Sequence, residues 1–174
     1  DEKKEITTEA LAFHLQSFEK LGVKHVGLSG GEALMHSNLW KFCELLKSIN
    51  VKISLLSTGI SLKAHAQDVV KYTDDVIVSL DGPPNIHNQI RNLPSAFEKL
   101  TAGVRALKEI DSRFRITGRC VLQKLNFQYL LEIIDTANAI GLDQISFLTA
   151  DVSTSAFNHN EPLTDDRVVQ IALS

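Results

Sequence analysis

The run Leu28-Ser29-Gly30-Gly31-Glu32 carries the strongest chemical signal in the sequence. It follows a predicted strand and precedes a predicted helix, and ligands of α/β proteins bind at that end of a strand. Two adjacent glycines let a ligand approach the backbone, because neither has a Cβ atom. The Glu32 carboxylate would repel a phosphate but suits an ammonium group, which offers three donors and no acceptor. The alternatives are a phosphate loop at the helix start or a tight connection without a ligand.

Hydroxyl and carboxylate side chains end the next two predicted strands. Ser57-Thr58-Gly59 is either a ligand contact or a turn with a capping hydroxyl, and the turn is the simpler interpretation. Ser79 and Asp81 precede the strong turn signal Gly82-Pro83-Pro84. Because they lie two residues apart on a strand, they share one face. A hydroxyl and a carboxylate there could bind a sugar diol, and a plain turn is the alternative.

Arg119 lies in a later predicted strand, on the same polar face as Asp81. Arginine is almost never fully buried without a partner. The side chain therefore either pairs with Asp81 or holds a ligand carboxylate through two parallel hydrogen bonds. His87 and Arg91 lie four residues apart after the proline turn, which fits one face of a short helix that we expect to be solvated.

Composition excludes several classes of protein. The chain is 44% hydrophobic and 22% charged, which is typical of a globular protein with a sizeable core. Its 18 Lys and Arg against 21 Asp and Glu form no basic block, so we expect no nucleic-acid partner. No apolar run approaches the roughly 20 residues that span a bilayer, so we expect no membrane partner. Cys43 and Cys120 are too far apart for a Cys-x-x-Cys metal clip and fit core thiols of a cytoplasmic protein.

Helical and strand patterns alternate along the chain. Each helix shows apolar residues at helical spacing, and each strand shows period-2 alternation. The predicted helices are 8–21, 38–49, 62–71, 94–109 and 127–140, with another from Thr164, and the predicted strands are 24–29, 51–57, 75–80, 114–122 and 144–149. This order implies an α/β fold with parallel strands, either an open doubly wound sheet or a barrel. We expect residues 1–150 to form the core and residues 151–174 an irregular tail and the start of a helix.

The alternation along the strands decides between these two architectures. Val76, Val78 and Leu80 form an aliphatic face of one strand. The opposite strand faces are polar and carry Ser29, Ser79, Asp81, Thr117, Arg119 and Ser146. Strands that are covered by helices on both faces should be almost continuously apolar, and these are not. We therefore predict a barrel or partial barrel with helices outside and a polar lumen that holds a ligand.

These motifs together resemble the radical S-adenosylmethionine (radical SAM) superfamily, especially its SPASM-type peptide-modifying and cofactor-maturing branch. The resemblance is carried by the run 28–34, by Ser57-Thr58-Gly59, and by the run 78–83 with His87 and Arg91, in that order and spacing. It implies a partial (β/α)6 TIM-like barrel, S-adenosylmethionine and a [4Fe–4S] cluster as cofactors. The implied reaction is reductive cleavage of S-adenosylmethionine to a 5′-deoxyadenosyl radical, which abstracts hydrogen from a peptide or a cofactor precursor.

The resemblance also implies roles for individual residues. Gly30, Gly31 and Glu32 would bind the methionyl ammonium group. Ribose or the methionyl carboxylate would be contacted by Ser57, Ser79 and Asp81, with help from Arg119 for the carboxylate, and Leu148 would lie near adenine. The implied partners are S-adenosylmethionine, a peptide or small-molecule substrate, and a reductant protein such as a flavodoxin or a ferredoxin.

The sequence departs from the family pattern at its first motif. The Cys-x-x-x-Cys-x-x-Cys loop that holds the cluster and the first barrel strand are missing, and Ala33 replaces a usual proline. The chain starts at Asp1 without Met and stops at Ser174 within a predicted helix, so we expect an excerpt of a longer protein that is inactive by itself. One alternative is a non-catalytic nucleoside- or peptide-binding barrel. Another is an aldolase-type barrel, which would need a lumen lysine that the predicted strand faces do not offer.

Overall fold

The five strands of the protein form one parallel sheet. The computed structural model describes residues 5–150 and residue 171. The strands lie side by side in chain order, each paired with the next, and are β1 (His25–Leu28), β2 (Lys52–Ser57), β3 (Asp75–Ser79), β4 (Arg115–Leu122) and β5 (Gln144–Thr149). A doubly wound sheet reverses its strand order at a switch point. The unreversed order is that of a barrel wall, so the predicted parallel barrel-type α/β fold is confirmed.

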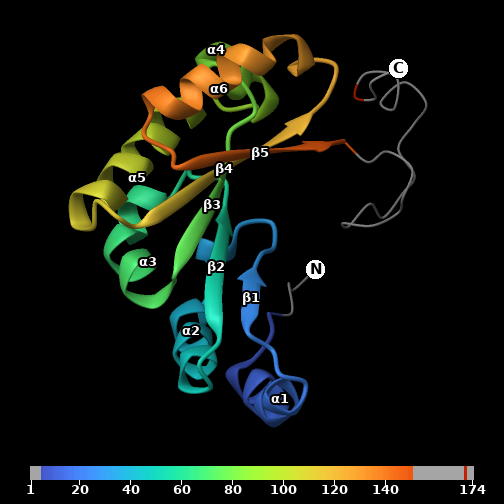
Figure 1. The fold of residues 1–174 in the computed structure, drawn as a ribbon, viewed down its shortest axis with the longest axis vertical. Coiled ribbons are helices and arrows are strands. Elements are labelled where there is room, and N and C mark those ends of the chain that lie inside the picture. Colours follow the sequence, from blue (N-terminus) through green and yellow to red (C-terminus); the bar gives the residue numbers. More distant parts are fainter. Residues whose placement is uncertain (1–4, 151–170, 172–174) are drawn as a thin grey trace.

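One helix precedes the first strand, and the other helices connect successive strands along one side of the sheet. They are α1 (Thr8–Lys20), η1 (Ala33–Met35), α2 (Leu39–Ser48), η2 (Leu62–His65), α3 (Ala66–Tyr72), α4 (Pro84–Ile90), α5 (Ala96–Ile110), η3 (Phe127–Tyr129) and α6 (Leu130–Ala139). Figure 1 shows α2, α3, α5 and α6 on the same side of the twisted sheet. Within the described part of the chain, no helix is long and apolar enough to cross a membrane.

Local sequence signals set the ends of the first helix. The Thr7 side chain caps α1 by accepting a hydrogen bond from the Ala10 N–H at 3.2 Å. The chain leaves α1 through Gly22, whose φ of +67° is unfavourable for other residues. The predicted helix from Thr164 lies outside the described residues apart from Ile171, and so does the predicted irregular tail that begins at residue 151. The helix, the tail and the boundary between residues 150 and 151 stay predictions.

The core lies between the sheet and its helices. Val76, Val78 and Leu80 are fully buried, as the strand alternation predicts. They belong to one apolar cluster with Leu100 and Val104 of α5. A second cluster packs α1 and α2 against β2 and is built around Cys43, Leu46, Val51 and Ile53. Both clusters contain the aliphatic strand positions, so the polar positions are left for the other face of the sheet.

Candidate functional site

A hollow of about 230 Å³ lies at the carboxyl ends of the strands. Five of the eight site residues predicted from the sequence line it, namely Gly30, Gly31, Ser57, Ser79 and Arg119. The other three, Glu32, Asp81 and Leu148, are not part of its wall. The carboxyl end of a parallel sheet is where α/β proteins bind ligands, because the connecting loops diverge there. We call this hollow the rim cavity.

Gly30 and Gly31, which we call the glycine corner, leave space in front of their backbone. A Cβ atom added to Gly30 or Gly31 would meet no atom of the described chain within 4 Å. The contrast is Gly59, where an added Cβ would lie 2.6 Å from the Leu100 side chain and where φ is +85°. Internal packing therefore requires glycine at residue 59 but not at the corner. Close approach of a ligand to the corner backbone is compatible with this geometry.

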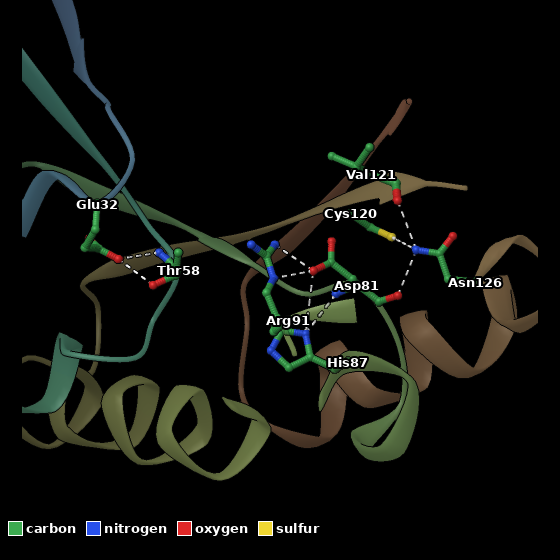
Figure 2. A network of polar contacts seen from close by, with 8 residues as sticks. All are labelled: Glu32, Thr58, Asp81, His87, Arg91, Cys120, Val121 and Asn126. Carbon is green, nitrogen blue, oxygen red and sulfur yellow. Dashed lines mark hydrogen bonds and ion pairs between the residues drawn. The ribbon is translucent and has the colours of Figure 1, made fainter. Parts of the chain in front are cut away.

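Glu32 fastens the glycine corner to the end of β2. One carboxylate oxygen, Oε2, accepts hydrogen bonds from the Ser57 hydroxyl at 3.1 Å, the Thr58 N–H at 2.9 Å and the Thr58 hydroxyl. The other, Oε1, accepts the Leu34 N–H at 3.3 Å and so caps η1. Figure 2 shows Glu32 facing Thr58 across the gap between the two loops. A carboxylate has about four acceptor positions, so Oε1 keeps capacity for a further donor.

Asp81 lies two residues beyond β3 and is 2% exposed. Its Oδ2 accepts hydrogen bonds from Nε and Nη2 of Arg91, each at 2.6 Å. The sequence left open a pair between Asp81 and Arg119, and the structure gives Asp81 a different arginine. Arg91 itself lines the rim cavity. The cationic partner of Asp81, and not its carboxylate, therefore reaches the hollow.

Arg119 is half-buried beside Ser79, its neighbour in the parallel register of β3 and β4. Its Nε is buried and has no hydrogen-bond partner among the described residues. A buried donor without an acceptor costs about 1–3 kcal/mol, and more when it is charged. An anionic group in the rim cavity would remove this cost, which fits the ligand-carboxylate interpretation of Arg119.

His87 is fully buried, so the expectation of a solvated helix face is wrong for this residue. Its Nδ1 accepts the Asp81 N–H at 3.2 Å and lies 3.8 Å from the Asp81 carboxylate. Its ring meets the Phe97 ring edge-on. Because α4 folds back over the end of β3, the face that carries His87 and Arg91 turns toward Asp81. Burial lowers the pKa of His87 to about 4 despite the nearby carboxylate, so the imidazole is neutral at neutral pH.

Asn126 completes the surroundings of Asp81, and sequence reasoning missed it. The residue is fully buried, and its Nδ2 donates to the carbonyl oxygens of Asp81 at 2.8 Å and Val121 at 2.9 Å. Its Oδ1 accepts the Gln123 N–H at 2.8 Å. Figure 2 shows the Asn126 amide between β4 and the Asp81 loop. An Asn in a turn after a strand is a local signal for side-chain bonding to the backbone, but its partner 45 residues earlier leaves no local signal.

Leu148 lies in β5 and is half-exposed, level with Val121 of β4 in the register. The register places both side chains on the sheet face that also carries Arg119 and Ser146. Leu148 is therefore on the predicted lumen face but outside the rim cavity. Its predicted contact with adenine stays a prediction.

The two cysteines are core residues, as predicted. Cys43 and Cys120 are free and fully buried. Burial raises the pKa of Cys43 to about 11 and that of Cys120 to about 12, which keeps both thiols protonated. Among the described residues, no group of three or more His, Cys, Asp or Glu side chains is arranged to hold a metal. These residues therefore do not provide a site for an iron–sulfur cluster.

The sheet order and the rim cavity define a partial barrel of the α/β class with a ligand hollow at the carboxyl ends of its strands. The family model of the radical SAM superfamily matches residues 1–146. The chain belongs to this superfamily of enzymes, which uses S-adenosylmethionine and a [4Fe–4S] cluster. The family predicted from the sequence motifs is thereby confirmed.

Named relatives agree with this family, and solved structures agree with the fold. The chain is 24% identical over 140 residues to "AdoMet-dependent heme synthase" of Methanosarcina barkeri, covering 79% of this chain and 40% of that protein. It is 26% identical over 176 residues to "GTP 3′,8-cyclase" of Staphylococcus epidermidis, covering 95% and 50%. The fold matches Streptococcus suis SuiB bound to S-adenosylmethionine with a TM-score of 0.72 at 13% identity, covering 95% of this chain and 38% of SuiB. The chain thus spans half or less of the length of these proteins.

Proposed function

We propose that this chain is the S-adenosylmethionine-binding barrel core of a radical SAM enzyme. The enzyme reductively cleaves S-adenosylmethionine to a 5′-deoxyadenosyl radical, which abstracts hydrogen from a peptide or a cofactor precursor. The observation that carries the proposal is the rim cavity, which has an open glycine corner on one side. On the other side lies the Arg119 Nε, which has no hydrogen-bond partner among the described residues. A zwitterionic amino-acid group has a carboxylate that can bind Arg119 and an ammonium group that can bind Glu32 at the glycine corner.

Different residues at the rim cavity bind the ammonium and the carboxylate of the methionyl group. Gly30 and Gly31 give the ammonium access to the corner, where Glu32 Oε1 can accept one of its donors. Arg119 binds the carboxylate, with the Ser79 hydroxyl next to it in the register. Ser57, whose hydroxyl already donates to Glu32, contributes an oxygen that can accept from ribose. Asp81 acts through Arg91, because its own carboxylate does not reach the hollow.

The thiols of Cys43 and Cys120 do not hold the [4Fe–4S] cluster of the proposed enzyme. The 174 residues contain two cysteines, and both are buried in the core, so three thiolate ligands are not available. We infer that the chain alone is catalytically inactive and assembles no cluster with iron and sulfide. Delivery of the electron by a flavodoxin or a ferredoxin, and a location in the cytoplasm, stay predictions.

Calorimetric titration with S-adenosylmethionine tests the proposal on the protein at the full length that its gene encodes. We expect saturable binding by the wild type and about 10–100-fold weaker binding by Glu32→Gln, because hydrogen bonds to charged groups contribute about 1.5–3 kcal/mol. Glu32→Gln keeps an oxygen acceptor for the corner, which limits damage to the fold. Glu19→Gln on the exposed face of α1 is the matched control and should bind like the wild type.

Absence of binding by the wild type, or equal affinities for all three proteins, would contradict the proposed function. Binding by a full-length protein that assembles no cluster would instead support the non-catalytic binding module.

A further inference from the structure

Arg91 enters the rim cavity with one side of its guanidinium already occupied. It follows α4 directly, and its side chain is 24% exposed. Nε and Nη2 both contact the Asp81 carboxylate, whose side chain is only 3% exposed. Figure 2 shows the remaining nitrogen, Nη1, turned away from Asp81. The ion pair therefore fixes the plane of the guanidinium and leaves one nitrogen available for another acceptor.

The charges around the rim cavity are unequal. Its wall contains two cationic side chains, Arg91 and Arg119, and no carboxylate. Asp81 pairs with Arg91 and compensates its charge. The Nε of Arg119, in contrast, has no acceptor among the described residues. Within the part of the chain that the structure describes, one positive charge is thus uncompensated at this side of the hollow. A carboxylate there would compensate it and could accept hydrogen bonds from both guanidinium groups.

The backbone N–H, the backbone carbonyl and the carboxylate oxygen Oδ2 of Asp81 each have a partner. Its N–H donates to His87, its carbonyl oxygen accepts from Asn126, and its carboxylate holds Arg91. Because His87 is neutral, it does not compete with Arg91 as a cation for the carboxylate 3.8 Å away. These contacts come from α4, from Arg91 directly after it and from the turn between β4 and η3, and together they hold Arg91 in one place.

We propose that Arg91 and Arg119 bind one carboxylate of the ligand between them, and that Asp81 is the positioning residue that aims Arg91. This inference rests on the proposed function, because the carboxylate is then the methionyl carboxylate of S-adenosylmethionine. It changes the role predicted for Asp81 from a ligand contact to a support, and it gives Arg91 a binding role that sequence reasoning did not assign.

A pair of ligands separates this role from a merely structural one. Decarboxylated S-adenosylmethionine keeps the adenosine, the sulfonium and the amine but has no carboxylate. The full-length wild type, Arg91→Gln and Asp81→Asn are titrated with each ligand, and the ratio of the two dissociation constants is compared. We expect Arg91→Gln to weaken binding of S-adenosylmethionine about tenfold or more and to leave the decarboxylated ligand within about twofold. Asp81→Asn should weaken binding in the same selective way, but less.

Two further variants control the experiment. Arg113→Gln removes an arginine whose side chain is 94% exposed and should change neither affinity. Arg91→Lys keeps a cation beside Asp81 but lacks the forked nitrogens, so it too should weaken only the carboxylate-bearing ligand. It serves if Arg91→Gln does not fold.

The outcomes also separate this inference from the proposed function. If the Arg91 variants weaken both ligands equally, or neither, the carboxylate role is wrong, while binding by the wild type still supports the proposed function. If the wild type binds no S-adenosylmethionine, both are overturned.

Discussion

Replacement of His87 by Asn should flatten the dependence of stability on pH. The imidazole is buried, and burial lowers its pKa to about 4 from the ordinary histidine value of 6.5. Between these values the unfolded chain binds a proton that the folded chain does not, so protonation favours unfolding. The stability that the neutral imidazole contributes is therefore complete above about pH 6.5 and falls as the pH is lowered toward 4. His87→Asn keeps an acceptor oxygen for the Asp81 N–H but cannot titrate.

The size of the effect follows from the difference between the two pKa values. Each unit of pKa corresponds to 1.36 kcal/mol. The difference of about 2.5 between 6.5 and 4 sets an upper limit of about 3 kcal/mol, which is approached below about pH 4. From about pH 7 to about pH 5 the loss due to this residue is about 2 kcal/mol. Coulombic interactions with Arg91 act in the same direction as burial, and those with Asp81 and Glu98 oppose it.

Urea unfolding at about pH 5 and about pH 7 measures this difference. The wild type should lose about 2 kcal/mol more than His87→Asn over that interval, whatever the variant costs at neutral pH. His14→Asn, in the exposed part of α1, is the matched control and should lose as much as the wild type. Equal losses for the wild type and His87→Asn would refute the assignment of a buried, neutral imidazole.

Three further predictions concern the surroundings of the site and the core. Asn126→Ala leaves three backbone groups without their partner and should cost about 3 kcal/mol in urea unfolding; a loss below about 1 kcal/mol would contradict its buried role. Gly59→Ala should cost at least about 1 kcal/mol more than Gly141→Ala, because both have positive φ but only Gly59 also faces a side chain at 2.6 Å; equal costs would contradict this. Cys43 and Cys120 should stay unreactive toward an aromatic disulfide reagent until the protein unfolds, because both thiols are buried and protonated, and rapid labelling of the native protein would oppose this.

The fold could be predicted from the sequence because each strand has one aliphatic face and one polar face. The alternation of Val76, Val78 and Leu80 with polar residues is a local pattern, and each of these aliphatic side chains is buried in the structure. A period-2 pattern also separates a one-sided sheet from a sandwiched one. The parallel direction of β1 to β5 then follows from the alternating helices.

The site was less accessible to sequence reasoning where it depends on long-range contacts. The spacing of His87 and Arg91 indicated a shared helix face, and α4 confirms the helix, but spacing does not say what the face meets. Asp81 is its partner only because α4 folds back over the end of β3. Asn126 shows the same limitation, since its carbonyl partner lies 45 residues earlier in the chain. Polar residues in a connection are expected to be solvated. His87 and Asn126 are instead buried, and both form hydrogen bonds with the backbone of Asp81.

The hydrogen bonds of Glu32 have a thermodynamic consequence for any cation that arrives at the corner. Three donors from the end of β2 and one from η1 already restrict the carboxylate to a single orientation. The Glu32 side chain therefore loses its rotamer freedom when the chain folds, before any cationic ligand binds. Preorganisation of this kind raises affinity without adding a contact, because association no longer has to order the acceptor. Loosening Ser57 or Thr58 should weaken capture of an amine even though Glu32 itself is unchanged.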